Sequence, residues 1–342
     1  MTIGDDNVKI AINGFGRIGR LVYRLMEEDN YFDVVAINDL SSSEDLAYLL
    51  KYDTNHRNYD KKVEFDEEGI IVEGKKVKVY SEKDPANLPW KELNIDLVFE
   101  CTGLFTNEAD ARKHLVAGAK KVLISAPSKG NVKTVVYNVN DDILTSGDEI
   151  VSAASCTTNC LAPVLKVLED NIGIEKGFMT TVHAYTNDQV TLDVSHKKGF
   201  KSRRGRACAM NIVPTSTGAA TAIGKVLPSL DGKLSGGALR VPVSDGSLID
   251  LSLELKRNTT VEEINNLFVS NTNETLKATY DPIVSSDIIT SRCGATVDLL
   301  LTNVLEVNDK QLVKVVAWYD NELGYSAQMV RTAKKLMEVT NG

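Results

Sequence analysis

The stretch VKIAINGFGRIG, residues 8–19, decides the fold class of the first half of the chain. Val8–Asn13 is a short run rich in Ile and Val, which is typical of a buried strand, and the glycines after it match the pattern G-x-G-x-x-G. A segment with helical apolar periodicity runs from Ile18 to about Glu28, and Val34–Ile37 predicts a second strand. Strand, glycine-rich turn, helix and strand form the βαβ unit of a dinucleotide-binding fold.

The glycines of this motif have a direct chemical use. Gly14, Gly16 and Gly19 let the backbone approach a pyrophosphate at the start of the helix, where amide hydrogens point outward. Asp39 follows the second strand about 20 residues after the last glycine, where a carboxylate accepts hydrogen bonds from an adenosine ribose. That carboxylate repels a 2′-phosphate, so the sequence favours NAD over NADP. The alternative is an ordinary tight turn before a helix, but the complete βαβ context favours the dinucleotide.

The rest of the first half alternates strands with helices. Strands are expected at Ile95–Glu100 and Lys121–Ser125, with a helix over Glu108–Ala117 between them. A further helix, with Ser43 as a possible cap, and a hairpin around Gly74 are expected over Asp45–Tyr52 and Ile70–Tyr80. This alternation predicts an α/β fold with a Rossmann-type, doubly wound parallel sheet over residues 1–155.

The pattern changes after about Ser155. A helix is expected over about Asn159–Glu169, and Pro163 should kink it or mark its start. Long strand-like runs, which suggest a mixed or antiparallel sheet, follow at Met179–Tyr185, Leu239–Val243, Leu248–Leu255, Ala295–Asp298 and Val313–Tyr319. The last segment, Ser326–Val339, is an amphipathic helix. With 342 residues, the chain is long enough for two domains.

Composition excludes several classes of function. The net charge of −8 argues against broad nucleic-acid binding, and no apolar run approaches the roughly 20 residues that span a bilayer. Met1–Asn7 is polar and acidic, unlike a secretory signal. An odd number of cysteines, five, favours free thiols in a reducing compartment, so a cytoplasmic location is expected. Cys156 and Cys160 are four residues apart, but no further Cys or His cluster completes a metal site.

The string SAASCTTNC, residues 152–160, lies where the two patterns meet. A cysteine at a helix start has its thiolate favoured by the exposed amide hydrogens, and a nearby imidazole would lower its pKa further. His183 lies near the end of an apolar strand, whose end projects side chains into a cleft. The other histidines are expected in a surface helix, a polar loop and a basic loop: His114, His56 and His196. A lone Cys is more often a core residue and a lone His more often structural, so these residues alone leave the pair Cys156 and His183 open.

Several segments together resemble the phosphorylating glyceraldehyde-3-phosphate dehydrogenases. They occur in the expected order over nearly the whole chain, and SCTTNC at residues 155–160 is highly specific. The segments are Val8–Gly19, Ser152–Cys160, Thr181–Thr186, Asn211–Ala220, Arg240–Pro242 and Trp318–Glu322.

The resemblance implies a role for each matched position. Cys156 would be the nucleophile and His183 its base. Besides the three glycines, the residues that contact NAD would be Arg17, Ile18, Asp39 and Ser125, with Asn321 on the nicotinamide amide. The substrate phosphate would be bound by Thr186 and Arg240, and the attacking inorganic phosphate by Ser155, Thr157, Thr217 and Gly218. The implied reaction converts glyceraldehyde 3-phosphate, NAD and phosphate to 1,3-bisphosphoglycerate and NADH through a thioester, a step of glycolysis.

The resemblance also implies a domain organisation and an assembly. Residues 156–321 would be an α+β catalytic domain with a mostly antiparallel sheet, and the C-terminal helix, residues 322–342, would complete the dinucleotide domain. The loop Thr186–Asn211 would line the cofactor site of a neighbouring subunit in a homotetramer. The arginines of this loop are interpreted as solvated residues or subunit contacts: Arg203, Arg204 and Arg206.

One departure from the family and two alternatives stay open. Members of the family that use only NAD usually carry proline where this chain has Ser195, so some use of NADP is possible. Erythrose-4-phosphate dehydrogenase is similar but prefers to hydrolyse its thioester. A binding or redox-sensing protein without turnover is the alternative from another class. The intact set Cys156, His183, Thr186 and Arg240 argues against it.

Overall fold

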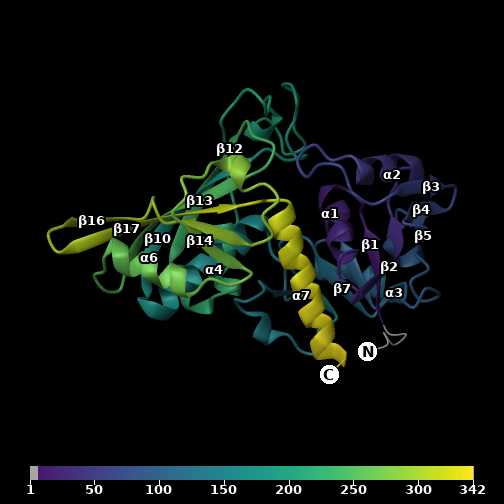
Figure 1. Cartoon of the computed structure of the whole chain (residues 1–342), viewed down its shortest axis with the longest axis horizontal. Helices are drawn as coiled ribbons and strands as arrows, with labels where there is room; N and C mark the ends of the chain where they lie inside the picture. Colours follow the sequence, from purple (N-terminus) through teal and green to yellow (C-terminus); the bar gives the residue numbers. More distant parts are fainter. Residues whose placement is uncertain (1–6, 342) are drawn as a thin grey trace. The chain divides into compact units, whose positions relative to one another are not determined.

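The computed structural model describes residues 7–341, so Met1–Asp6, most of the polar N-terminal segment, lies outside the described residues. The chain divides into two units (Figure 1). Unit 1 comprises Met1–Tyr137, Asp141–Ala154 and Met329–Gly342, and unit 2 comprises Asn138–Asn140 and Ser155–Gln328. The main boundary falls between Ala154 and Ser155, next to the boundary expected from the sequence.

Unit 1 is built on a nine-stranded sheet of order β3-β4-β5-β2-β1-β6-β7-β9-β8. The strands are β1 (Val8–Asn13), β2 (Phe32–Asn38), β3 (Val63–Asp66), β4 (Gly69–Val72), β5 (Lys75–Tyr80), β6 (Leu97–Glu100), β7 (Lys121–Ile124), β8 (Lys133–Thr134) and β9 (Ile150–Ser152). From β5 to β8 neighbouring strands run parallel, and β3, β4 and β5 form an antiparallel meander. The predicted parallel sheet and the hairpin around Gly74 are thereby confirmed.

The helices of unit 1 agree with the sequence except at one cap. They are α1 (Arg17–Met26), α2 (Ser43–Lys51) and α3 (Glu108–Val116). The prediction of Ser43 as the cap of α2 is wrong, because Ser42 takes that position and its hydroxyl accepts a hydrogen bond of 3.1 Å from the Asp45 amide. The C-terminal helix α7 (Leu323–Asn341) begins in unit 2 and continues in unit 1 (Figure 1). Within unit 1, Lys334 of α7 donates to Asp29 at 3.0 Å.

The strand order places three polar residues together at the carboxyl edge of this sheet. The chain passes from β1 to β2 on one side and later returns to β6 on the other side of β1. Asn13 therefore lies in register with Asn38 and with Glu100, and each of the three ends its strand. This reversal is the place where open parallel sheets bind their ligands.

Unit 2 has an eight-stranded sheet of order β11-β12-β10-β13-β17-β15-β14, with β16 paired to β17. The strands are β10 (Ile174–Ala184), β11 (Val213–Thr215), β12 (Leu234–Val241), β13 (Ser247–Leu255), β14 (Leu276–Thr279), β15 (Ala295–Asp298), β16 (Asn303–Val307) and β17 (Lys310–Tyr319). Among these strands only the β10–β12 and β14–β15 pairs are parallel, which confirms a mostly antiparallel sheet. The helices α4 (Cys156–Asn171), α5 (Ala219–Ala222) and α6 (Val261–Ser270) complete the unit, together with short 3-10 turns such as Arg203–Gly205.

Helix α4 starts earlier than the sequence indicates. It begins at Cys156 and continues through Pro163 to Asn171, so Pro163 does not mark its start. The reason is local: the Ser155 hydroxyl accepts a hydrogen bond of 3.1 Å from the Thr158 amide and caps the first turn. None of the helices within residues 7–341 is both long and apolar enough to cross a bilayer.

Candidate active site

A cavity of about 420 Å³ lies at the carboxyl edge of the unit 1 sheet. Its lining includes Gly14, Gly16 and Asp39. Gly14 has φ +91°, and a β-carbon there would lie 2.7 Å from the Thr102 nitrogen, so only glycine fits this turn. The cavity, the bare backbone and the carboxylate fit the pyrophosphate and ribose of a dinucleotide.

Asp39 lies at the glycine-rich turn, as the fold prediction requires. Its carboxylate accepts hydrogen bonds from the Phe15 amide at 2.8 Å and from the Ser41 amide at 3.0 Å. Two backbone donors thus hold the carboxylate at the cavity, and a carboxylate has lone pairs left for two ribose hydroxyls.

The other predicted cofactor residues occupy four different surroundings. Ile18 is half-buried in the first turn of α1, and the Ser125 amide donates to the Glu100 carbonyl at 2.9 Å. The Arg17 guanidinium forms a forked ion pair with Asp53 at 2.6 and 3.1 Å. In unit 2, Asn321 is buried and its side-chain oxygen accepts from the Ser247 hydroxyl at 2.6 Å.

In unit 2 the predicted nucleophile and base are in contact. The Cys156 sulfur at the start of α4 lies 3.4 Å from Nε2 of His183, near the end of β10. His183 is buried and its Nδ1 lies 2.7 Å from the Ala184 carbonyl oxygen. A carbonyl only accepts, so Nδ1 carries the hydrogen and Nε2 is free to accept a proton from the thiol. The residue before the cap, Ala154, has φ +59°, an uncommon conformation that directs the chain into this helix.

Burial sets the protonation states of this pair. Burial raises the pKa of the Cys156 thiol, and the charge of Arg240 and a hydrogen bond from the Thr157 amide oppose it with smaller effects. The prediction that the helix start and the imidazole lower the pKa of Cys156 is therefore wrong. Burial, reinforced by the charge of Arg240, lowers the pKa of His183 to about 3, which makes it a neutral base at physiological pH. Proton transfer from sulfur to Nε2 would create two opposite charges that attract each other at 3.4 Å.

A series of hydrogen-bonded hydroxyl groups lies next to Cys156 and His183. The Thr181 hydroxyl donates to the Leu248 carbonyl at 3.0 Å, so it must accept from the Tyr319 hydroxyl, 2.9 Å away. Tyr319 has one hydrogen, so it accepts from the Thr157 hydroxyl, also at 2.9 Å. The Tyr319 ring packs edge-on against His183. The Thr157 hydroxyl hydrogen is thus committed to Tyr319, and its amide is the donor left for a ligand.

Arg240 and Thr186 form an anion cradle next to this pair. Arg240 on β12 is in register with His183 on β10. Its guanidinium donates to the Ala184 carbonyl at 2.8 Å and to the Thr186 hydroxyl at 3.0 Å. The Arg240 Nε is buried and has no hydrogen-bond partner within the described residues. A buried donor without an acceptor costs about 1–3 kcal/mol, so the side chain is prepared for an anion.

The remaining residues predicted to bind inorganic phosphate have few hydrogen bonds to the rest of the site. The Ser155 hydroxyl serves as the cap of α4. Thr217 accepts from the Ala219 amide at 3.2 Å, and Gly218 is exposed. No hydrogen bond within the described residues joins Thr217 or Gly218 to Cys156.

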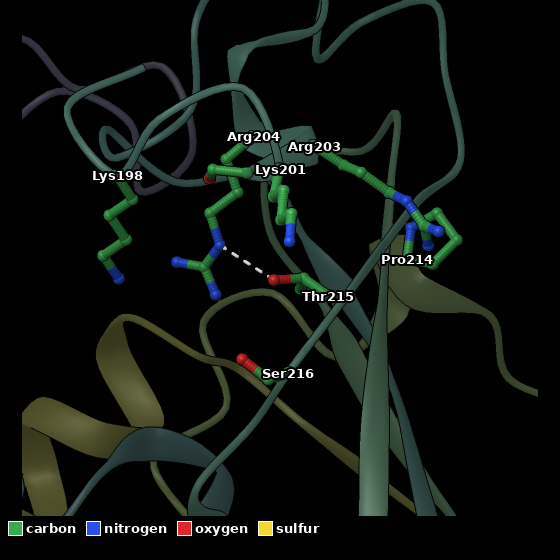
Figure 2. Close-up of a pocket in the computed structure, with 8 residues that line it drawn as sticks. Lys198, Lys201, Arg203, Arg204, Pro214, Thr215 and Ser216 are labelled. Atoms are coloured by element: carbon green, nitrogen blue, oxygen red, sulfur yellow. Dashed lines mark hydrogen bonds between the residues drawn. The ribbon is translucent and has the colours of Figure 1, made fainter.

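The sequence missed one arginine of the neighbouring loop. Arg204 pairs with Asp188 and donates to the Thr215 hydroxyl at 3.2 Å, and Asp188 also accepts from Thr186 at 2.5 Å. A cavity of about 520 Å³ is lined here by Lys198, Lys201, Arg203, Arg204 and Thr215, among others. Figure 2 shows that Arg204 reaches Thr215 while Arg203 points away toward Pro214. Of the two interpretations of Arg204, the solvated side chain is wrong, because Arg204 is connected to the anion cradle through Asp188, and the subunit contact stays a prediction.

Two histidines are more deeply buried than the sequence indicates. His114, expected on a surface helix, is fully buried and lies 3.0 Å from Glu100. His56, expected in a polar loop, has a buried side chain against Asp53. Burial of Asp53 would raise its pKa, but hydrogen bonds from His56 and Arg17 together hold that pKa well below its usual range.

Comparisons with known proteins agree over nearly the whole chain. Residues 8–108 match the family described as glyceraldehyde 3-phosphate dehydrogenase, NAD binding domain, and residues 155–321 match the C-terminal domain of the same family. Glyceraldehyde-3-phosphate dehydrogenase of Clostridium pasteurianum is 53% identical over 331 residues, which cover 97% of this chain and 99% of the relative. The protein of the same name from Clostridium acetobutylicum is 53% identical over 95% of this chain and 97% of its own length. The one from Streptococcus pyogenes is 51% identical over 97% of this chain and 99% of its own length.

Proposed function

The chain belongs to the glyceraldehyde-3-phosphate dehydrogenase family, and on that premise we propose that Cys156 carries the substrate as a thioester while His183 moves its proton. It is an NAD-dependent oxidoreductase that oxidises glyceraldehyde 3-phosphate in glycolysis. The observation that carries the residue assignment is the 3.4 Å contact between the Cys156 sulfur and an unprotonated His183 Nε2.

The proposed reaction follows from these two groups. The Cys156 thiolate, formed as Nε2 of His183 takes its proton, bonds to the aldehyde carbon, and His183 returns that proton to the carbonyl oxygen to give a neutral thiohemiacetal. His183 then accepts the hydroxyl proton as the carbon loses its hydride. Bound NAD supplies the hydride acceptor. The thioester conserves the energy of oxidation, and inorganic phosphate attacks its carbonyl carbon to release 1,3-bisphosphoglycerate and the Cys156 thiolate.

The proposed roles follow the matched positions. In unit 1, the cavity lined by Gly14, Gly16 and Asp39 would hold NAD. Further contacts to the dinucleotide would come from Gly19, Arg17, Ile18 and Ser125, and Asn321 would hold the nicotinamide amide. In unit 2, Arg240 and Thr186 would hold the phosphate of the aldehyde. The attacking phosphate would be bound by Ser155, Thr157, Thr217 and Gly218, and Thr157 would act through its amide because its hydroxyl donates to Tyr319.

Arg240→Ala should raise the KM for glyceraldehyde 3-phosphate about ten- to a hundredfold, since a charge-assisted hydrogen bond contributes on the order of 1.5–3 kcal/mol. The KM for unphosphorylated glyceraldehyde should change far less. Steady-state kinetics on the two aldehydes makes the comparison. An equal increase for both would mean that Arg240 only holds Ala184 and Thr186 in place.

Replacing Asp39 with serine should lower kcat/KM for NAD and raise kcat/KM for NADP relative to that for NAD. The carboxylate that accepts from Phe15 and faces the cavity would bind ribose hydroxyls and repel a 2′-phosphate. The measurement is kcat/KM for both cofactors in wild type and variant. Faster turnover of NADP than of NAD by the wild type would contradict this role and would point to Ser195 as the dominant influence.

We further propose a homotetramer in which the loop Thr186–Asn211 contacts a neighbouring subunit. Three apolar side chains of this loop are strongly exposed: Leu192 at 75%, Phe200 at 94% and Met210 at 82%. Exposed apolar side chains gathered on one loop are typical of a surface that another subunit covers. Light scattering should give the mass of four chains, and a monomer would contradict the proposal.

One assay separates the two related activities. Oxidation of glyceraldehyde 3-phosphate should exceed that of erythrose 4-phosphate and should depend on inorganic phosphate. Turnover without phosphate and a preference for the four-carbon sugar would favour a hydrolytic relative instead. The reaction fits the cytoplasm, where the five unpaired cysteines of the described residues would stay reduced.

A further inference from the structure

A buried polar network borders the cavity at the carboxyl edge of unit 1, and two of its members, Asn13 and Asn38, line that cavity. Its members are Asn13, Asn38, Glu100 and His114, and each is at most 5% exposed. The first three end the strands β1, β2 and β6, and His114 comes from α3. Buried polar groups cost stability unless every one of them is satisfied, so a network of this size at a binding edge calls for a reason.

The tautomer of His114 follows from its neighbours. The Trp90 indole nitrogen lies 3.0 Å from Nδ1 of His114, and an indole only donates, so Nδ1 is the acceptor. The ring hydrogen is then on Nε2, which donates to Glu100 at 3.0 Å. These two contacts together fix one tautomer and one orientation of the His114 ring.

The Glu100 carboxylate accepts hydrogen bonds from several groups at the carboxyl edge of the unit 1 sheet. Oε2 accepts from His114 and from the Asn13 amide group at 2.6 Å. Oε1 accepts from the Thr102 amide at 2.9 Å and from the Thr102 hydroxyl. Thr102 is the residue against which the Gly14 turn packs, since a β-carbon on Gly14 would lie 2.7 Å from its nitrogen. The orientation of the Glu100 carboxylate therefore fixes one wall of the cavity.

Asn13 connects Glu100 to Asn38, which forms another part of the cavity wall. Because its side-chain nitrogen donates to Glu100, its oxygen faces Asn38 and accepts from that amide at 2.7 Å. Asn38 in turn bonds the Glu82 backbone at 2.9 and 2.8 Å. The Asn38 carbonyl accepts from the Gly14 amide at 2.8 Å, and the next residue along the chain is Asp39. Every amide in the series has one permitted orientation, set at one end by His114.

We propose that His114 is a positioning residue for dinucleotide binding, which acts through Glu100 and Asn13 on the Gly14 turn and Thr102. The proposal rests on the assignment of this cavity to NAD made above. In this role His114 does not contact the cofactor. Its Nε2 hydrogen orients the Glu100 carboxylate, and that carboxylate orients Thr102 and Asn13 at the cavity.

The test compares two replacements of similar shape. The amide of His114→Gln can still donate to Glu100, and His114→Met fills the same space without a donor. His114→Met should raise the Kd for NAD about tenfold, measured by titration calorimetry on the intact protein, while His114→Gln stays near the wild type. The KM for NAD should rise with the Kd, and the KM for glyceraldehyde 3-phosphate should not change.

Val122→Ala is the control for a general loss of stability, because Val122 is buried on β7 in the same unit and its side chain lies outside the network. It should lower the Tm without changing the Kd for NAD. If His114→Met does not fold, His114→Asn replaces it, since its amide can meet Trp90 but is too short for Glu100, and it should also weaken NAD.

Three results would overturn the role of His114. They are a wild-type Kd in His114→Met, an equal increase in His114→Gln and His114→Met, or an equal increase in Val122→Ala. Asp39→Ala distinguishes a failure of the positioning role of His114 from a failure of the assignment of the cavity to NAD. If Asp39→Ala leaves the Kd for NAD unchanged, the assignment of the cavity to NAD is wrong. If Asp39→Ala weakens NAD and His114→Met does not, only the positioning role falls.

Discussion

Cys156→Ser should lower kcat roughly 10⁴-fold or more while leaving the Kd for NAD unchanged. A serine hydroxyl is barely ionised near neutral pH, so it cannot take the place of a thiolate at the aldehyde carbon. The substitution removes one sulfur at the start of α4 and leaves the Ser155 cap and the cavity of unit 1 intact. Steady-state kinetics and calorimetric titration of NAD provide the two readouts.

The matched control for this variant is Cys160→Ser, one helical turn further along α4. Cys160 is fully buried, and burial raises the pKa of its thiol well above the usual value. It should therefore alkylate more slowly than Cys156, and its loss should affect Tm more than kcat. Substantial activity in Cys156→Ser, or faster alkylation of Cys160, would contradict the assignment of the nucleophile.

His183→Asn should lower kcat about 10²- to 10⁴-fold, the usual contribution of a positioned general base. The variant loses both the acceptor 3.4 Å from the sulfur and the positive partner of the thiolate. Alkylation of Cys156 near neutral pH should slow as well, and its midpoint should move to higher pH. The direction follows because a thiolate next to His183 is stabilised by the imidazolium that has taken its proton, and asparagine carries no such charge.

The pH dependence of kcat provides a second test of the role of His183. Because the pKa of His183 is lowered to about 3, the imidazole is neutral over the working range and the wild type should not lose activity through protonation of a free His183 near pH 6. The decrease in kcat should also exceed the decrease in the alkylation rate, since the base acts again during oxidation. Equal decreases would limit His183 to activation of the thiol.

Local patterns predicted the parts of the site that depend on neighbouring residues. The turn at Gly14 and the carboxylate of Asp39 belong to one βαβ unit, so their spacing determines their contact. The cap of α2 was missed by one residue because Ser41, Ser42 and Ser43 are chemically alike, and only the backbone geometry decides which of them caps.

The errors arose where the outcome depends on distant residues. α3 carries many polar residues, which indicated a surface position for His114, but Trp90 and Glu100 enclose it. Arg204 lies in a loop without periodicity, and its partner Asp188 could not be assigned from spacing. The pKa of Cys156 was predicted from the helix start and the imidazole alone, whereas its burial and the charges of Arg240 and Asp245 depend on residues distant in the sequence.

The most direct test of the account is mass spectrometry of the protein mixed with glyceraldehyde 3-phosphate and NAD in the absence of inorganic phosphate. We expect one NADH for each active site in a rapid burst, together with a phosphoglyceroyl group on the peptide that contains Cys156. Addition of phosphate should remove that group and release 1,3-bisphosphoglycerate. NADH formation with no acyl group on Cys156, or with the group on another residue, would contradict the thioester on which the proposed function depends.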